Sequence, residues 1–322
     1  MKVLIIDTDS PYALGRLYHN AAVGLGINSD YKTNDEILKV RKYSKDNILK
    51  YLEHSNYRIK WNQKLFELIQ KNKYDVVIFF RLSPVSSSTI LHFRLLYKIK
   101  FVIIWPDSIL FYKNNLLDTL QNVDLIASYS EKDVSIFKSL KCDNVQFIPL
   151  GFDSQIYKPQ VLDKVFDISF LGLRQNYREE FIHAVSKNTD RRIFVSGPNW
   201  KNFKSKNLHI TDKTFHSHEA CTVYNSSFVS LNIVDPTNYP AANMRFFEIN
   251  ACNTIQLSNQ IPEFMNEFDL ETGNLFYETP EDAGNLISKF WNYNFNIVSR
   301  IMKMQEKNCY QTRLTRIISL LK

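Results

Sequence analysis

Short apolar runs alternate with helical patterns along the first half of the chain. Lys2–Ile6 is a continuous apolar run that ends at Asp7, and strand-like runs follow at Asp75–Phe80 and Phe101–Ile104. Runs of this kind are typical of parallel strands that are buried on both faces. Two shorter strands are predicted at Asp124–Ala127 and Val145–Ile148. Between the strands, helices are predicted at Ala13–Leu25, Asp35–Glu53, Trp61–Lys71, Ser87–Tyr97, Asn114–Gln121 and Glu131–Leu140.

The same alternation restarts after a non-periodic stretch, Pro149–Lys164. Strands are predicted at Phe166–Leu171, Arg192–Ser196, Phe228–Val234, Thr254–Leu257 and Asn274–Tyr277. Helices are predicted at Asn176–Lys187, His218–Tyr224, Met244–Cys252, Pro262–Glu267, Pro280–Trp291 and Arg300–Leu320. Strands that alternate with helices indicate doubly wound parallel sheets. The pattern therefore predicts two α/β halves, joined near residues 150–160, and a long final helix.

Length and composition agree with this organisation. The 322 residues suit two domains, because single cores stop growing near about 250–300 residues. No apolar run reaches the ~20 residues that span a bilayer, and Met1–Asp7 begins a strand at once, so no signal peptide is expected. Cys142, Cys221, Cys252 and Cys309 form no Cys-x-x-Cys pair. We therefore expect a reduced, cytoplasmic protein without a disulfide framework.

Positive charge is concentrated in one stretch of the first half. Residues 1–150 carry 21 Lys and Arg against 15 Asp and Glu, whereas residues 151–322 carry 19 against 18. Lys32–Lys73 alone holds 11 basic and 5 acidic residues. Such a stretch suits a membrane surface, a nucleic acid or an anionic substrate, or it is a solvated helical face. Because it shows no fold signature of nucleic-acid-binding proteins, no nucleic acid is expected as a partner.

Two aspartates, Asp7 and Asp9, follow the first strand. The pair is open to three interpretations: the motif of haloacid dehalogenase-type phosphatases, which it resembles, a metal-binding Asp-x-Asp, or a cap for the following loop. The phosphatase motif requires a threonine where Pro11 stands. Metal-binding pairs of this kind usually occur in the middle of a chain. We favour the loop cap.

Several common catalytic signatures are absent from the sequence. There is no Gly-x-x-x-x-Gly-Lys phosphate loop, and Gly24-Leu25-Gly26 ends a helix instead of beginning one. Neither Gly-x-Ser-x-Gly nor His-Glu-x-x-His occurs. His216 and His218 have no carboxylate partner at ligand spacing, so we interpret them as polar groups of a loop. No metal site is expected.

Glycines follow two predicted strands in the second half. Gly172 comes after Phe166–Leu171, and Arg174 and Arg178 lie four residues apart beyond it. A strand, a glycine and a helix N-terminus form an arrangement that accepts phosphate, because free backbone N–H groups and the helix dipole favour an anion. The two arginines would add charge-assisted hydrogen bonds. The segment Ser196-Gly197-Pro198-Asn199-Trp200 gives a second glycine of the same kind.

The segment Asn243–Ile255 is the most informative part of the sequence. Its helix is predicted to begin near Ala242, where the first turn offers backbone donors to a phosphate. Glu248 lies further along this helix, where a carboxylate would accept hydrogen bonds from both hydroxyls of a ribose. The alternative is a structural glutamate that pairs with Arg245, three residues before it.

This segment, with Phe166–Arg178 and Cys309-Tyr310-Gln311-Thr312-Arg313, resembles the group-1 glycosyltransferases of GT-B fold. It is most similar to the branch named after the spore-maturation protein CgeB. That branch has Phe-x-Gly-x…Arg, then Arg-x-Phe-Glu-x-x-Ala-Cys-Gly, then a C-terminal aromatic-x-x-Arg. In the first half the similarity is looser and rests on Trp105-Pro106-Asp107, Asp124–Tyr129 and Ile148–Pro159. The resemblance covers most of the chain from about residue 100.

The resemblance implies two Rossmann-like domains, 1–155 and 156–300, with a cleft between them. A C-terminal helix, 301–322, would pack back on the first domain. The implied activity is transfer of a sugar from a nucleotide-sugar donor to a glycan, lipid-linked or protein acceptor, with no metal or other cofactor. Glu248 would hold the ribose, arginines the diphosphate, and Gly197 to Trp200 would border the base. The implied donor-binding residues are Gly172, Arg174, Arg178, Gly197, Asn199, Trp200, Asn243, Arg245 and Glu248.

Two positions depart from the family pattern. Pro240 stands where related retaining enzymes have a glutamate, eight positions before the ribose-binding one, and this leaves the sugar contact and the stereochemistry open. Asn253 replaces the glycine that follows Ala-Cys, but asparagine also adopts a left-handed conformation.

An inverting reaction would need a general base from the first domain. Asp7, Asp9, Asp107 and His19 are candidates, because we expect them at strand ends or just after them. The basic stretch Lys32–Lys73 would meet an anionic acceptor, or the inner membrane surface that carries a lipid-linked one. A non-catalytic nucleotide- or sugar-binding protein and a nucleotide-sugar epimerase of the same fold remain as alternatives.

Overall fold

In a computed structural model the chain forms two compact units. One unit is Met1–Pro149 together with Tyr310–Lys322, and the other is Leu150–Cys309. The structure describes residues 1–10, 12–38, 47–80, 84–109, 117–201, 203, 206–268, 273–290 and 307–322. Parts of the predicted helices Asp35–Glu53, Asn114–Gln121, Pro280–Trp291 and Arg300–Leu320 lie outside these residues.

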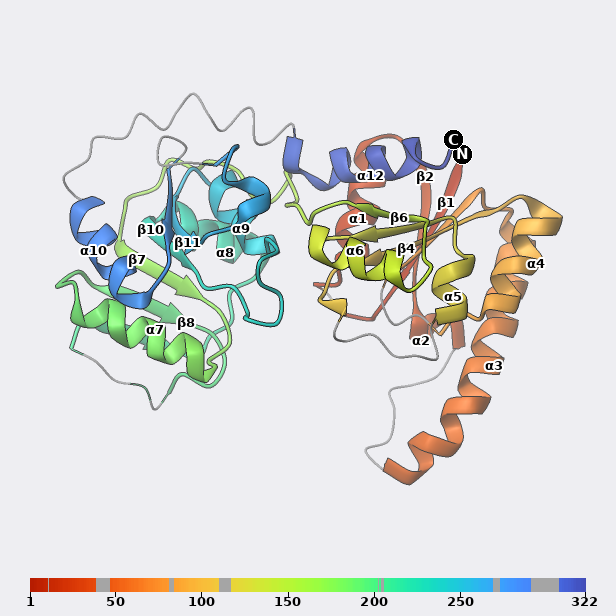
Figure 1. The fold of residues 1–322 in the computed structure, drawn as a ribbon, viewed down its shortest axis with the longest axis horizontal. Coiled ribbons are helices and arrows are strands. Elements are labelled where there is room, and N and C mark those ends of the chain that lie inside the picture. Colours follow the sequence, from red (N-terminus) through yellow and green to blue (C-terminus); the bar gives the residue numbers. More distant parts are fainter. Residues whose placement is uncertain are drawn as a thin grey trace. The chain divides into compact units, whose positions relative to one another are not determined.

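A parallel sheet forms the centre of the first unit (Figure 1). Its six described strands have the order β2-β1-β3-β4-β5-β6. They are β1 (Lys2–Asp7), β2 (Asn28–Thr33), β3 (Val76–Phe80), β4 (Lys100–Trp105), β5 (Leu125–Ser128) and β6 (Val145–Phe147). The apolar runs predicted as strands are confirmed as β1, β3, β4, β5 and β6. The pattern does not predict β2, whose residues are mostly polar and only partly buried because the strand lies at the sheet edge.

The helices of this unit pack against the sheet and against one another. They are α1 (Leu14–Gly24), α2 (Asn34–Leu38), α3 (Asn47–Asn72), α4 (Ser87–Tyr97), α5 (Leu117–Asn122) and α6 (Glu131–Ser139). The predicted break between Glu53 and Trp61 is wrong, because α3 runs through it. No glycine or proline interrupts this segment, and Trp61, Leu65 and Ile69 form one buried face at four-residue spacing.

The C-terminal segment returns to the first unit as α12 (Tyr310–Ser319). Leu314 and Ile317 belong to the same core cluster as Val3 of β1. The ring of Tyr310 lies 5.1 Å from that of Tyr18 on α1. The amphipathic final helix therefore completes the core of a sheet that begins more than three hundred residues earlier.

The second unit also has a parallel sheet. Its six described strands have the order β12-β11-β10-β7-β8-β9. They are β7 (Phe166–Leu171), β8 (Ile193–Ser196), β9 (Leu208–Thr211), β10 (Ser227–Asn232), β11 (Ile255–Asn259) and β12 (Asn274–Tyr277). Its helices are α7 (Asn176–Lys187), α8 (Ser217–Asn225), α9 (Met244–Ala251) and α10 (Pro280–Phe290), with a short 3-10 helix at Pro262–Phe264. The edge strand β9 is not predicted by the pattern. The predicted α/β class is confirmed, since both units are Rossmann-like.

Candidate functional site

The carboxyl ends of β7 and β10 define a candidate site in the second unit. These strands are neighbours in the sheet although β8 and β9 lie between them in sequence. In open α/β sheets, ligands bind beyond the carboxyl ends of the strands where the strand order reverses in this way. β7 ends at Leu171 and β10 at Asn232, and each chain segment then leads into a helix, α7 or α9. Helix N-termini therefore lie at this edge.

Two glycines bring the ends of β7 and β8 into close contact. The N–H of Gly172 donates to the carbonyl of Ser196 at 2.8 Å, and Gly197 has φ +143°. A Cβ atom on Gly197 would overlap the carbonyl group of Gly172. The indole N–H of Trp200 donates to that carbonyl oxygen at 2.7 Å, and the Trp200 side chain is fully buried beside Phe170. Trp200 thus stabilises the ends of β7 and β8 from the core. Because it has no exposed surface, its predicted place beside the base of a nucleotide is wrong.

Arg178 and Arg245 approach one aromatic ring at this edge. The guanidinium carbon of each lies 5.9 Å from the ring centre of Phe170. Nη1 of Arg178 donates to the carbonyl of Leu173 at 2.9 Å. Within the described part of the chain, the Nε atoms of both arginines are buried and make no hydrogen bond. Burial, and then repulsion from Arg245, lowers the pKa of Arg178. Two neighbouring cations with spare N–H groups form a site that an anion would stabilise.

Arg174 is engaged by a carboxylate. Its Nε and Nη2 atoms lie 2.7 and 2.6 Å from Oε2 of Glu179. Its Nη1 atom donates to the carbonyl of Asn199 at 3.4 Å. Asn199 is exposed, with φ +72°. The structure therefore ties Arg174 to the loop of Asn199, and it is Arg245, not Arg174, that shares the Phe170 ring with Arg178.

Asn243 joins the start of α9 to the end of β10. Its Oδ1 atom accepts a hydrogen bond from the backbone N–H of Phe246 at 3.0 Å, which caps the helix. Its Nδ2 atom donates to Oδ1 of Asn232 at 2.9 Å. The predicted start of the helix near Ala242 is thus confirmed within two residues. The Asn243 side chain acts here as a cap that fixes where α9 begins.

Glu248 lies one turn further along α9 and is almost fully buried, with 9% of its surface exposed. Burial raises the pKa of its carboxyl to about 7, although Arg245 and a hydrogen bond from Tyr157 act in the opposite direction. Arg245 also forms a hydrogen bond with Tyr224. Glu248 is therefore a carboxylate held inside the unit by a tyrosine, next to the arginine three residues before it.

Three aspartates lie at the carboxyl edge of the first sheet. Asp7 is buried and accepts hydrogen bonds from the backbone N–H groups of Thr8 and Gly15, each at 2.7 Å. It therefore caps the loop that leads into α1, as the favoured interpretation predicts. Asp9 is exposed and lies 3.8 Å from Nη2 of Arg16. Asp107 follows β4 and is partly buried.

His19 does not lie at this edge, so its predicted position at a strand end is wrong. It is on α1, and its Nδ1 atom lies 3.0 Å from Oγ of Ser29. Ser29 pairs with Val3, four residues before the end of β1 at Asp7. At ~3.3 Å per residue, the histidine is about 13 Å from the level of Asp7. Helix α1 carries it back along the sheet, and burial lowers its pKa.

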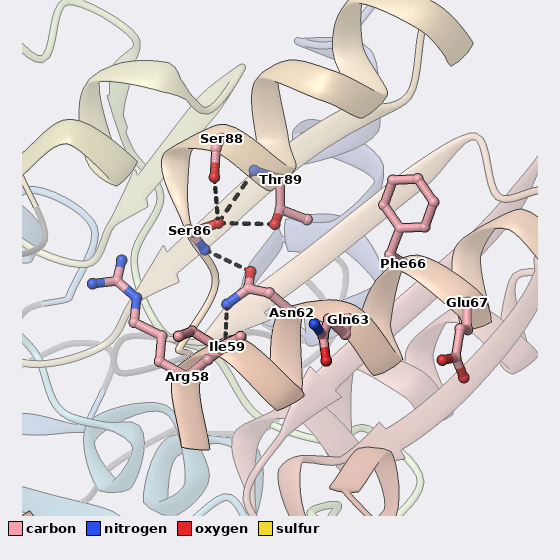
Figure 2. Close-up of a pocket in the computed structure, with 9 residues that line it drawn as sticks. All are labelled: Arg58, Ile59, Asn62, Gln63, Phe66, Glu67, Ser86, Ser88 and Thr89. Carbon is pink, nitrogen blue, oxygen red and sulfur yellow. Dashed lines mark hydrogen bonds between the residues drawn. The ribbon is translucent and has the colours of Figure 1, made fainter. Parts of the chain in front are cut away.

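A groove lies between α3 and the start of α4 in the first unit (Figure 2). Its volume is about 510 Å³, and it is lined by Arg58, Ile59, Asn62, Gln63, Phe66, Glu67, Ser86, Ser88 and Thr89. Oγ of Ser86 accepts a hydrogen bond from the backbone N–H of Thr89 at 3.2 Å, and Oδ1 of Asn62 accepts one from the N–H of Ser86 at 2.8 Å. The hydroxyl and amide groups suit a polar ligand. Residues 39–46 of the basic stretch Lys32–Lys73 lie outside the described residues.

Neither a metal site nor a membrane-spanning helix is found in the described part of the chain. No three His, Cys, Asp or Glu side chains gather there as ligands of a metal ion. No described helix is long and apolar enough to cross a membrane.

Comparisons with known proteins bear on the fold and on the second unit. Residues 174–303, less than half of the chain, match the model of a glycosyl transferase-like family. No curated protein matches the sequence. Anabaena HepE, solved in complex with UDP and glucose, is 12% identical, with a TM-score of 0.67 over 100% of this chain and 99% of that one. Sucrose-phosphate synthase from Thermosynechococcus elongatus is 13% identical, with a TM-score of 0.61 over 100% and 95%.

UDP-GlcNAc 2-epimerase from Methanocaldococcus jannaschii is also similar, at 14% identity, with a TM-score of 0.57 over 99% of both chains. Identities this low show the fold alone. The chain has the GT-B fold, with two Rossmann-like units. Membership of the CgeB-like branch stays a prediction.

Proposed function

We propose that this protein transfers a sugar from a nucleotide-sugar donor to a glycan, lipid-linked or protein acceptor, without a metal ion. The observation that carries the proposal is the pair Arg178 and Arg245 beside Phe170, at the carboxyl edge where the strand order reverses. The glycosyl transferase-like match of residues 174–303 supports it. So does the fold shared with HepE, whose structure holds UDP and glucose.

The two arginines would bind the diphosphate of the donor. When the bond between the sugar and the diphosphate breaks, negative charge grows on the leaving phosphate. Guanidinium groups that are already in place offset this charge without reorganisation. The N-terminus of α9 adds partial positive charge. A Cβ atom added at Gly172 would lie 2.9 Å from the Phe170 ring and 3.6 Å from Nη1 of Arg178, so glycine would leave room for a phosphate beside the arginine.

Other residues would border the rest of the donor. We assign Glu248 to the ribose: a carboxylate offers about four acceptor positions, and the hydroxyl of Tyr157 occupies one of them. Arg174, whose charge Glu179 offsets, would mainly hold the loop of Asn199 near the base.

The first unit would bind the acceptor. The base of an inverting reaction would be Asp9 or Asp107, since both follow strand ends of its sheet. The groove beside Ser86 offers hydroxyl and amide groups to a polar acceptor.

Arginine variants test the donor site. Arg178→Ala and Arg245→Ala should each weaken binding of nucleoside diphosphate about 10- to 100-fold, because a hydrogen bond to a charged group contributes about 1.5–3 kcal/mol. Arg192→Ala is the matched control, since that side chain is 80% exposed and lies by Asp167, near the other end of β7. Titration calorimetry gives the affinities. If both variants bind as the parent does, the diphosphate does not lie at these arginines.

Product analysis separates the proposed activity from its alternatives. A transferase incubated with a panel of nucleotide sugars releases nucleoside diphosphate slowly even without an acceptor. An epimerase, suggested by the fold shared with the Methanocaldococcus enzyme, converts the nucleotide sugar without releasing the nucleotide. A non-catalytic binding protein does neither. Epimerised product, or no turnover of any donor that binds, would contradict transfer.

A further inference from the structure

Helix α4 is apolar on both of its faces. Ile90 and Phe93 are fully buried in the core of the first unit. Away from the core, Leu95 is 78% exposed and Leu96 67%, and Tyr97, one turn after Phe93, is 49% exposed at the end of the helix. Isolated proteins rarely gather large apolar side chains on their surface. Nothing in the described part of the chain covers this outer face of α4.

A groove with a basic rim runs along the same face. Its volume is about 430 Å³, and it is lined by Leu91, Arg94, Leu95, Lys98, Ile99, Lys100 and Asp124. The lining carboxylate belongs to Asp124, whose side chain is 9% exposed. It lies 3.3 Å from Nε of Arg94 and 3.2 Å from Nζ of Lys100. The rim therefore has three cations, Arg94, Lys98 and Lys100, and one carboxylate. Its net charge is positive, next to Leu91 and Leu95.

The end of α3 extends this surface. Nε2 of Gln70 donates to the hydroxyl of Tyr97 at 3.2 Å, so the end of α3 lies against the end of α4. Lys71 and Lys73, at the end of α3 and just beyond it, are exposed. They belong to the basic stretch of the sequence. Exposed basic side chains thus occur at or just beyond the ends of both neighbouring helices.

We propose that the outer face of α4, with its basic rim, docks onto the surface of an anionic lipid bilayer. Leucine and tyrosine side chains enter the boundary between head groups and acyl chains, while lysines and arginines attract anionic head groups. A second copy of the chain is a poorer occupant, because a two-fold contact through this face would bring the two basic rims together. This inference is independent of the proposed sugar transfer.

Vesicle flotation of the purified full chain tests the proposal. The probes are vesicles of phosphatidylcholine alone and of phosphatidylcholine mixed with phosphatidylglycerol, at low salt and at about 1 M salt, where screening acts within about 3 Å. The variant is Leu95→Ser with Leu96→Ser, which changes exposed side chains only. The control is Val161→Ser with Leu162→Ser in the second unit, at side chains that are 105% and 40% exposed. Circular dichroism and thermal unfolding show that each variant is folded.

The parent and the control should float with the anionic vesicles at low salt, and at least tenfold less with phosphatidylcholine or at high salt. The α4 variant should associate at least tenfold more weakly than the control. The proposal is overturned if the parent does not bind anionic vesicles, or if the α4 variant binds them as strongly as the parent does. It is equally overturned if size exclusion shows a dimer that the α4 variant dissociates, because a second copy then covers the face.

Discussion

Replacing Glu248 with glutamine should stabilise the second unit in a pH-dependent way. Burial raises the pKa of this carboxyl from 4.5 to about 7. A raised pKa means that the folded protein favours the protonated carboxyl. The stability that this gives is fully present below the pKa of the unfolded chain, and it is lost as pH rises through the pKa of the folded state. The raised pKa therefore corresponds to about 3 kcal/mol, lost between pH 4.5 and about 7. Glutamine keeps an acceptor for the Tyr157 hydroxyl but carries no charge to desolvate.

Urea unfolding of parent and variant across this pH range measures the effect. Near pH 4.5 the two proteins should have similar free energies of unfolding, whereas above the native pKa, at about pH 8, the variant should be more stable by about 3 kcal/mol. Glu180→Gln, at an exposed glutamate, is the control and should change stability by less than about 0.5 kcal/mol at both pH values. A gain for Glu248→Gln that does not depend on pH would refute the reasoning, and so would a loss of stability above pH 7. Weaker nucleoside diphosphate binding by the more stable variant would be expected of a ribose ligand.

Two further predictions concern the edge formed by β7 and β8. Gly197→Ala should destabilise the second unit by about 3 kcal/mol or more, because the new Cβ atom would overlap the carbonyl of Gly172 at a residue with positive φ. Thermal unfolding measures the loss. An unchanged unfolding midpoint would contradict the close approach of the two glycines. Trp200→Phe should lower the free energy of unfolding by about 2–4 kcal/mol, because it removes the indole N–H that donates to the Gly172 carbonyl and leaves a cavity. Urea unfolding measures this change. A loss below about 0.5 kcal/mol would count against the hydrogen bond.

The pattern of apolar residues predicted the central strands because burial alone specifies them. The segment Val76–Phe80 is apolar at every position and buried at every position. Edge strands behave differently. The sequence of β2, Asn28–Thr33, has no such pattern, and it is a strand because it pairs with β1 along its whole length. The break predicted between Glu53 and Trp61 was wrong, because α3 is continuous and its residues Trp61, Leu65 and Ile69 are buried in the core.

The candidate site was only partly accessible from the sequence. Gly172, Arg178 and Arg245 were placed at strand ends and helix starts, and the structure has them there. The partners of these residues were not predictable. Glu179 binds Arg174, and the Phe170 ring, an ordinary core position of β7 in the sequence, lies beside two arginines. The sequence placed His19 just after a strand, as a general base would require. In the structure it lies on α1, away from the carboxyl edge of the first sheet.

The sequence by itself determined the alternation of buried strands and helices, the turn glycines and the location of the positive charge. These depend on neighbours within a few residues, where periodicity and backbone sterics act. The tertiary structure decided which distant segments meet. The order of the strands places β7 beside β10, and Arg178 and Arg245 therefore meet at the ring of Phe170. The last helix, α12, packs in the same core cluster as β1. Such contacts follow from the burial of whole helix and sheet faces against each other, a property that no short stretch of the chain contains.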